Sequence, residues 1–125
     1  MEQLLLHLIG DYITQTDWMA KNKINDIRVA SLHAIIYSLP FLFITHSLLA
    51  LSVICITHIF IDRYRIARYV IFAKNKITNW SLNWDDCNTT GYPKTLPDWL
   101  AVWLMIICDN TLHLTINYLS LKYLL

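Results

Sequence analysis

The sequence predicts an all-α integral membrane protein, a helical bundle of about four helices, and three observations lead to this fold class. Of the 125 residues, 56% are hydrophobic and only 15% are charged, whereas a soluble domain carries about 25% charged residues. Long apolar runs alternate with short polar stretches, and the basic residues gather in those stretches. The length suits a single membrane domain over residues 1–125. A net charge of +1 gives no reason to expect nucleic acid as a partner, so the expected partner is the lipid bilayer.

The first apolar segment covers residues 4–20 and contains three ionisable side chains, His7, Asp11 and Asp17. Because charged groups are costly at membrane depth, hydropathy alone predicts a weak membrane-spanning helix here. A polar stretch follows at residues 21–28.

The second apolar region covers residues 29–61, which is too long for one membrane span of about 20 residues and somewhat short for two. Pro40 lies inside it, and a proline in a helix interior breaks or kinks the helix. We therefore predict a short helical hairpin around Pro40, with one helix ending at Leu39 and the next beginning at about Phe41. The second helix is expected to continue into the basic segment of residues 63–76.

Residues 78–98 are rich in Asn, Asp, Gly and Pro, which favour turns, so a loop is predicted before the last helix. That helix is expected over residues 97–119, because Pro97 suits a first helical turn and Asp98 suits the positive end of the helix dipole. Aromatic residues typical of a membrane–water interface lie in or beside the loop: Trp80, Trp84, Tyr92 and Trp99.

Basic residues predict the topology, because cytoplasmic loops of membrane proteins are enriched in Lys and Arg. Of the ten Lys and Arg residues, only Lys122 lies beyond the last predicted helix, and the others fall in residues 21–28 and 63–98. We therefore expect a multi-pass protein in which both of these loops are cytoplasmic and both termini are outside.

Histidine and aspartate recur four residues apart in three predicted helices: His7 with Asp11, His58 with Asp62, and Asp109 with His113. Residues i and i+4 share one face of a helix, so each helix presents one imidazole and one carboxylate from a single stripe. A charged side chain at membrane depth costs at least about 2.5 kcal/mol. Retaining several of them indicates a functional or structural reason.

Imidazole and carboxylate groups are ligands for Zn²⁺ and related divalent metals, so we predict a divalent metal cofactor, zinc above others. The predicted metal ligands are His7, Asp11, His33, His58, Asp62, Asp109 and His113. Seven groups exceed the four ligands of one zinc ion. Either a mononuclear site with a general base or a two-metal site would use them, and Asp11 and Asp109 are the predicted catalytic residues.

The predicted topology aligns only part of this set. The first helix runs inward and the last runs outward, so His7 is expected at the level of His113, and Asp11 at the level of Asp109. His58 and Asp62 lie nearer the cytoplasmic end, and the simple topology does not align them with the other residues.

Two other readings of the polar set stay open: a structural polar network without metal, and a proton or ion pathway. His46 has no carboxylate four residues away, so it is expected as a polar tip at the outer interface. The arginine cluster of Arg63, Arg65 and Arg68 is expected to contact lipid headgroups. Alternatively, Arg63, which directly follows Asp62, holds a substrate phosphate beside the site.

Three runs of sequence are distinctive: HLIGDYITQTDWMAKNK, THIFIDRYRIARYVIFAKN and TGYPKTLPDWLAVWLMIICDNTLHLTINYL. Together they resemble the domain of unknown function 3307 family of small phage and bacterial membrane proteins, over nearly the whole chain. The resemblance implies a phage or prophage origin and a bacterial inner-membrane location, and it supplies no activity. The motif positions are His7, Asp11, Gln15, His33, His58, Asp62, Asp109 and His113. Residue types alone also resemble the membrane-bound metal-dependent hydrolases of bacteria.

The function expected from the sequence is a metal-dependent membrane hydrolase acting on a lipid-borne or phosphate-bearing substrate. The first alternative is a non-catalytic phage protein of the inner membrane that modulates host membrane, defence or lysis through a membrane-protein partner. The second is a proton or ion pathway. The three cysteines, Cys55, Cys87 and Cys108, form no CxxC pair and are expected to be free thiols.

Overall fold

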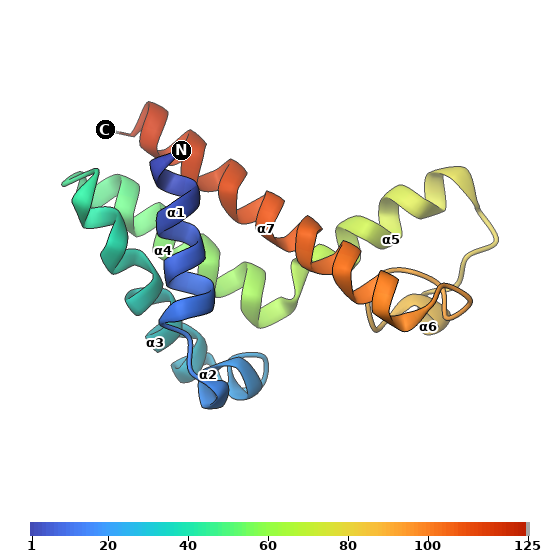
Figure 1. Cartoon of the computed structure of the whole chain (residues 1–125). Coiled ribbons are helices and arrows are strands. Elements are labelled where there is room, and N and C mark those ends of the chain that lie inside the picture. The colour runs from blue at the N-terminus through green and yellow to red at the C-terminus, as the bar shows by residue number, and fades with distance from the viewer. Residues whose placement is uncertain (125) are drawn as a thin grey trace. The chain divides into compact units, whose positions relative to one another are not determined.

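A computed structural model describes residues 1–124, and these residues form two compact units. The first unit comprises residues 1–64 together with the chain from His113 onward, and the second comprises residues 65–112. The regular elements of the described residues are all helical, which confirms the all-α class. In Figure 1 the helices are labelled in chain order from α1 to α7.

The first apolar segment is not one helix, as the sequence predicts, but two helices separated by a turn. The α1 helix (Glu2–Leu8) continues into a π-helical turn, η1 (Ile9–Ile13), and α2 (Asp17–Asn22) follows after residues 14–16. The Thr14 hydroxyl donates to the carbonyl of Gly10 at 2.9 Å, and the Thr16 hydroxyl caps α2 by accepting from the backbone N–H of Met19. These short side-chain bonds compete with a continuous helix and start a new one.

The predicted hairpin around Pro40 is present in the first unit. The α3 helix (Ile27–Ser38) is followed by a 3₁₀ turn, η2 (Leu39–Phe43), and then by α4 (Leu48–Tyr64). The helix break at Pro40 is confirmed, but the second helix begins at Leu48 rather than at about Phe41, because the 3₁₀ turn and residues 44–47 intervene. The helices α3 and α4 pack against each other, and Leu6, Tyr37, Phe41 and Ile54 form a buried cluster.

The second unit contains α5 (Ile66–Thr78), α6 (Trp84–Cys87) and residues 98–112 of α7 (Asp98–Tyr123). The basic segment is helical, but it does not continue α4, because Arg65 adopts a left-handed conformation with a φ of 51°. The predicted loop contains the short helix α6. The side chains of Arg65 and Arg68 hold this loop by donating to the carbonyls of Thr89 and Asn88, each at 2.9 Å.

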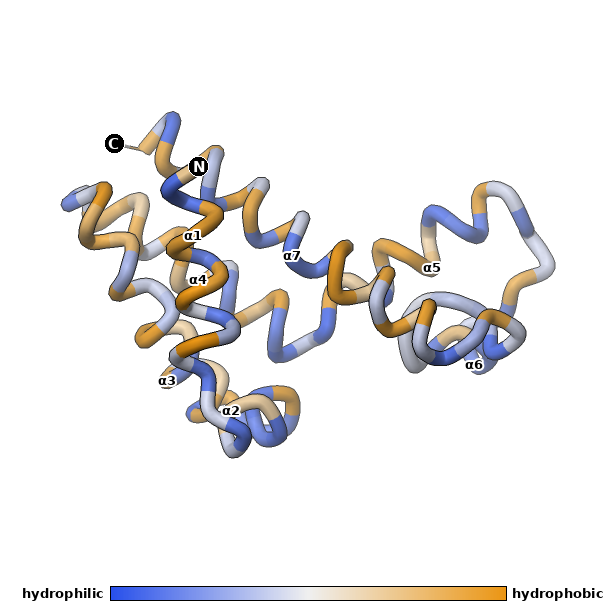
Figure 2. The backbone as a smooth tube through the Cα atoms, viewed as in Figure 1, coloured by the Kyte–Doolittle hydropathy of each residue, from blue (hydrophilic) through white to orange (hydrophobic). Residues whose placement is uncertain are grey.

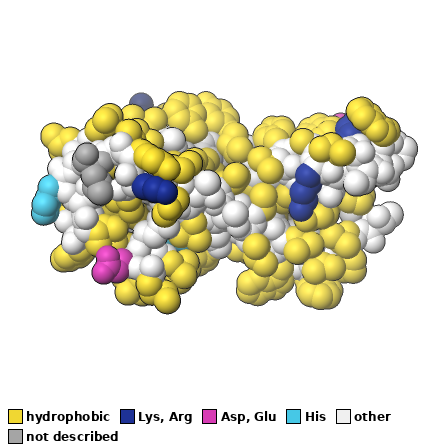
Figure 3. Space-filling view, turned by 90° about the horizontal axis from the view of Figure 1, so that it is seen from above, with side chains coloured by type: hydrophobic (Ala, Val, Ile, Leu, Met, Phe, Trp, Pro, Cys, Tyr) yellow, Lys and Arg dark blue, Asp and Glu magenta, His cyan; other side chains and the backbone are white. Residues whose placement is uncertain are grey.

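One described helix, α7, is long and apolar enough to cross a membrane, while the apolar stretch Ile27–Phe43 is shorter. In Figure 2, hydrophobic positions alternate with hydrophilic ones along the helices. Large apolar side chains are exposed to an unusual degree: Phe43 is 88% exposed, Leu48 80% and Ile13 76%. The face drawn in Figure 3 is covered mainly by hydrophobic side chains, with a few separate charged ones.

Candidate metal centre

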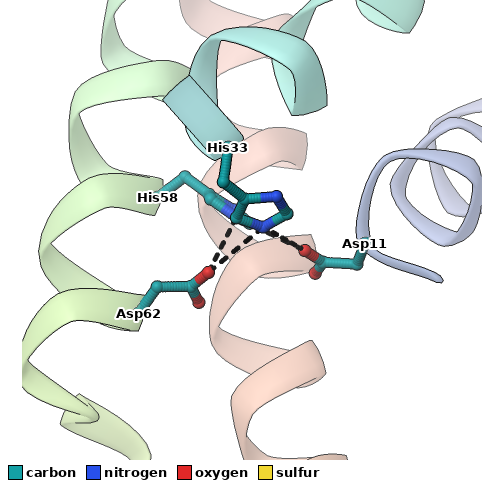
Figure 4. A group of neighbouring side chains, drawn as sticks. All are labelled: Asp11, His33, His58 and Asp62. Atoms are coloured by element: carbon teal, nitrogen blue, oxygen red, sulfur yellow. Dashed lines mark hydrogen bonds and ion pairs between the residues drawn. The ribbon is translucent and has the colours of Figure 1, made fainter. Parts of the chain in front are cut away.

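Four ionisable side chains of the first unit converge at one point, as Figure 4 shows: Asp11 from η1, His33 from α3, and His58 and Asp62 from α4. The Nε2 atoms of the two histidines lie 3.0 Å apart. The Oδ1 atom of Asp11 lies 3.2 Å from the His33 Nε2 and 3.3 Å from the His58 Nε2. The Oδ2 atom of Asp62 lies 3.3 Å and 3.1 Å from the same two nitrogens. All four residues are buried.

These separations suit a tetrahedral metal ion. Zinc binds imidazole nitrogen and carboxylate oxygen at about 2.0–2.2 Å, so ligand atoms around one ion lie about 3.3–3.6 Å apart. The five separations that involve a histidine nitrogen are 3.0–3.3 Å, at or slightly below this range. A ring nitrogen carries either one proton or one lone pair, so hydrogen bonds alone leave part of this cluster unsatisfied. A divalent cation can contact all four of these ligand atoms at once.

Two further histidines lie close to the carboxylates. The Nε2 of His113 lies 3.2 Å from the Oδ1 of Asp62, and the Nδ1 of His7 lies 3.6 Å from the Oδ2 of Asp11. The predicted ligands His7 and His113 therefore lie beside the four-residue centre, and His113 is placed to orient the Asp62 carboxylate, the arrangement by which supporting groups strengthen metal sites. The Nδ1 of His7 is closer to the hydroxyl of Tyr37 than to Asp11. The rings of His7 and His113 lie 5.8 Å apart, at one level, as the antiparallel topology predicts.

The buried side chain of Tyr37 links these groups, and sequence reasoning missed it. Its ring stacks on the His58 ring, with centroids 3.7 Å apart. Its hydroxyl lies 2.9 Å from the Nδ1 of His7 and accepts from the Nδ2 of Asn117 at 2.6 Å. A signal was present, because Tyr37 follows His33 by four residues and so shares its helix face.

The outer nitrogens of the two central histidines depart from the usual pattern of metal sites. The Nδ1 atoms of His33 and His58 are buried, with no hydrogen-bond partner among the described residues. In most metal sites the second ring nitrogen donates to a carboxylate or carbonyl. Here packing orients the rings instead, most directly the stacked ring of Tyr37 on His58. The ligand atoms fit a metal ion, while the support behind the histidines is weaker than usual.

Lys23 also contacts the metal centre, although its position in the sequence predicted only a residue of a cytoplasmic loop. Its Nζ donates to the Oδ2 of Asp62 at 2.6 Å and lies 3.5 Å from the Nε2 of His33. The side chain of Arg63 holds the same loop by donating to the carbonyl of Ile24.

Other candidate residues lie outside the four-residue centre. Asp109 belongs to the second unit, and its predicted catalytic role remains a prediction. His46 is exposed in the turn before α4.

The three cysteines are free thiols, as expected. Burial raises the pKa of the Cys87 thiol, which keeps it protonated and unreactive.

The absence of a side chain at Gly10 allows η1, and with it Asp11, to approach α3. A Cβ at this position would lie 2.6 Å from the Cδ2 of Tyr37 and 3.0 Å from its carbonyl oxygen. We expect Gly10→Ala to lower the free energy of unfolding by about 1–3 kcal/mol, the usual cost of overpacking, and to weaken metal binding. Thermal unfolding in detergent and zinc titration measure both effects. Ala20→Ser adds one heavy atom at an exposed position of α2, and an equal loss in that control would contradict the packing explanation.

The family model described as "Protein of unknown function (DUF3307)" matches residues 1–85. The matched part contains all four residues of the metal centre and two of the three distinctive runs, and it ends before the third. No curated protein and no solved structure matches the chain. Since the match covers more than half of the chain, the protein belongs to the DUF3307 family of proteins of unknown function.

Proposed function

We propose that this protein is a metal-dependent membrane hydrolase with one zinc ion held by His33, His58 and Asp62, and with Asp11 as the general base. The observation that carries the proposal is the convergence of two imidazole nitrogens and two carboxylate oxygens in a buried interior, where the two nitrogens lie 3.0 Å apart and each lies 3.1–3.3 Å from both oxygens. Burying two carboxylates and two histidines this close together costs free energy unless a partner balances their charge.

The four side chains divide into ligands and a base. Catalytic zinc sites keep three protein ligands and one position for water, whose pKa the ion lowers to about 7. We assign His33, His58 and Asp62 as the three ligands. Asp11 would accept the proton of such a water, because its Oδ1 lies 3.2 Å and 3.3 Å from the Nε2 atoms of the two ligand histidines. His113 orients Asp62 through its other oxygen.

The distribution of polarity supports a membrane location. In the first unit the buried residues include six histidines and aspartates, while large apolar side chains such as Phe43 and Leu48 are exposed. Contiguous exposed apolar surface marks contact with lipid or a partner, and α7 is long enough to span a bilayer. We propose a multi-pass protein of the bacterial inner membrane, of phage origin, with residues 21–28 and 63–98 on the cytoplasmic side.

One observation favours a second candidate, a non-catalytic membrane protein whose buried cluster is a structural network. The Lys23 ammonium is hydrogen-bonded to Asp62, so a cation of the chain itself already balances one carboxylate. In this alternative the protein acts through a membrane-protein partner, and its effect persists when the base is removed without loss of fold.

Hydrolysis of activated esters tests the choice between the two candidates. Zinc-loaded full-length protein in detergent is expected to hydrolyse p-nitrophenyl acetate or bis-p-nitrophenyl phosphate, to lose this activity in chelator, and to regain it with zinc. Asp11→Asn is expected to lower the rate by about 10²–10⁴-fold, the usual contribution of a general base.

The matched control is Asp17→Asn, which changes an exposed aspartate of α2 and is expected to leave the rate unchanged. If fully zinc-loaded protein hydrolyses neither ester faster than the Asp11→Asn variant, the hydrolase proposal is wrong and a non-catalytic role is supported.

A further inference from the structure

The side chain of Lys23 is the most exposed of those that meet at the metal centre. It is 17% exposed, compared with 10% for Asp11, 5% for Asp62 and 0% for His33. Lys23 follows the short helix α2, in a loop that Arg63 holds through the carbonyl of Ile24. The Lys23 side chain therefore lies where the buried cluster meets the surface.

The charge of the cluster changes sign when a divalent metal binds. Two carboxylates and one ammonium give a net charge of −1 with the histidines neutral, and a divalent ion raises it to +1. An uncompensated charge in a buried site is costly, so the metal-loaded centre favours an anionic ligand. The Lys23 ammonium lies beside this site, because it donates to the same Oδ2 of Asp62 that lies 3.3 Å and 3.1 Å from the two histidine nitrogens.

We infer that Lys23 forms a phosphate-binding subsite beside the metal, so that the protein takes a phosphate-bearing ligand. This inference rests on the proposed function, since it requires the metal. A phosphate group directs several oxygens outward, so one oxygen binds the ion while another binds the ammonium. Lysine is a common phosphate-binding residue that acts as a point charge, and its flexible stem allows it to leave Asp62.

A second positive charge favours phosphate over a singly charged carboxylate. That charge comes from the bound ion itself, so the ammonium and a divalent metal together suit a group that carries up to two negative charges. The guanidinium of Arg63 donates to the carbonyl of Ile24, the residue next to Lys23, and so holds the loop that carries the ammonium. The phosphate group can belong to a lipid headgroup or to a soluble molecule, and both present the same chemistry.

Titration of inorganic phosphate into zinc-loaded full-length protein, in a maltoside detergent that lacks phosphate, tests this subsite. A hydrogen bond to a charged group contributes about 1.5–3 kcal/mol, which corresponds to roughly 10–100-fold in affinity. We expect Lys23→Met to weaken phosphate binding by that factor, and Lys23→Arg to restore part of it. Acetate is expected to bind more weakly than phosphate to the unchanged protein.

Lys21→Met is the matched control, because Lys21 lies in α2 with a side chain that is 71% exposed, and its ion pair among the described residues is with the exposed Asp17. It is expected to leave phosphate affinity unchanged. Glycerol phosphate and phosphatidic acid in mixed micelles then distinguish the sources. Tighter binding of the lipid indicates a headgroup ligand, and equal binding indicates a soluble phosphate.

Zinc content, measured for each variant, separates failure of the subsite from failure of the metal centre. If zinc binds and phosphate binds equally to the unchanged protein and to Lys23→Met, the subsite is wrong while the metal centre stands. Equal binding of acetate and phosphate also overturns the assignment to phosphate. If no zinc binds, the proposed function and this inference fail together.

Discussion

Replacement of His33 by alanine is expected to reduce the affinity for zinc by more than about a hundredfold. Loss of a group that merely supports a ligand costs about 10–100-fold, and His33 provides a ligand atom itself. Its Nε2 lies within 3.3 Å of the His58 nitrogen and of an oxygen from each aspartate, so its removal opens one side of the centre. Competitive titration with a chromophoric chelator measures the change, and His58→Ala is expected to behave in the same way.

The chain offers a matched control in His46, an exposed histidine in the turn before α4. His46→Ala is expected to leave zinc affinity unchanged. A loss of equal size in His46→Ala, or an unchanged affinity in both His33→Ala and His58→Ala, would show that zinc binds elsewhere. Thermal unfolding of each variant separates lost ligation from lost fold.

Replacement of Asp62 by asparagine is expected to destabilise the metal-free protein by about 3–5 kcal/mol, the usual cost of breaking a buried ion pair by removing one partner. The Asp62 side chain is 5% exposed and pairs with Lys23 at 2.6 Å. It also faces His58 and His113. Its removal leaves an ammonium at the edge of a buried cluster without its carboxylate. Unfolding followed by circular dichroism in detergent, with chelator present, measures the difference.

A second lysine–aspartate pair in the same unit is the natural comparison. Lys21 and Asp17 pair at 2.8 Å, with side chains that are 71% and 80% exposed, and exposed pairs contribute about 0–1 kcal/mol. We expect Asp17→Asn to fall in that range. Adding Lys23→Met to Asp62→Asn should recover part of the lost stability, because it removes the unpaired charge. Equal effects of Asp17→Asn and Asp62→Asn would contradict the buried position of the Asp62 pair.

Helical periodicity was enough to predict several features. The spacing of His58 and Asp62 placed them on one face of a helix, and Pro40 marked the break between α3 and α4. The free thiols also followed from the sequence. These features depend on residues near each other in the chain, which periodicity and proline chemistry describe well.

The alignment of the site was not predictable, because it depends on where the first helix stops. A helix over residues 4–20 would place Asp11 in its middle, away from the end of α4. In the structure η1 ends at Ile13 and α4 ends at Tyr64, so Asp11 and Asp62 both lie in the last turn of their helices. The hydroxyls of Thr14 and Thr16 set that stop, and no hydropathy pattern reveals it.

Lys23 could not be predicted for a related reason. Its role follows from a contact with Asp62, 39 residues away along the chain, and a lysine in a polar loop is ordinarily solvated. The role of Tyr37 was easier to predict, because its four-residue spacing from His33 is present in the sequence. An aromatic residue in an apolar helix, however, ordinarily belongs to the hydrophobic core.

X-ray absorption at the zinc edge, on the full-length protein loaded with one equivalent of zinc, tests the central claim most directly. The account predicts one zinc per chain, with only nitrogen and oxygen ligands at about 2.0–2.2 Å and the multiple-scattering signature of two imidazoles. That signature should fall to one imidazole in His33→Ala and remain at two in His46→Ala. A sulfur ligand at about 2.3 Å, or a spectrum unchanged in His33→Ala, would contradict the metal centre.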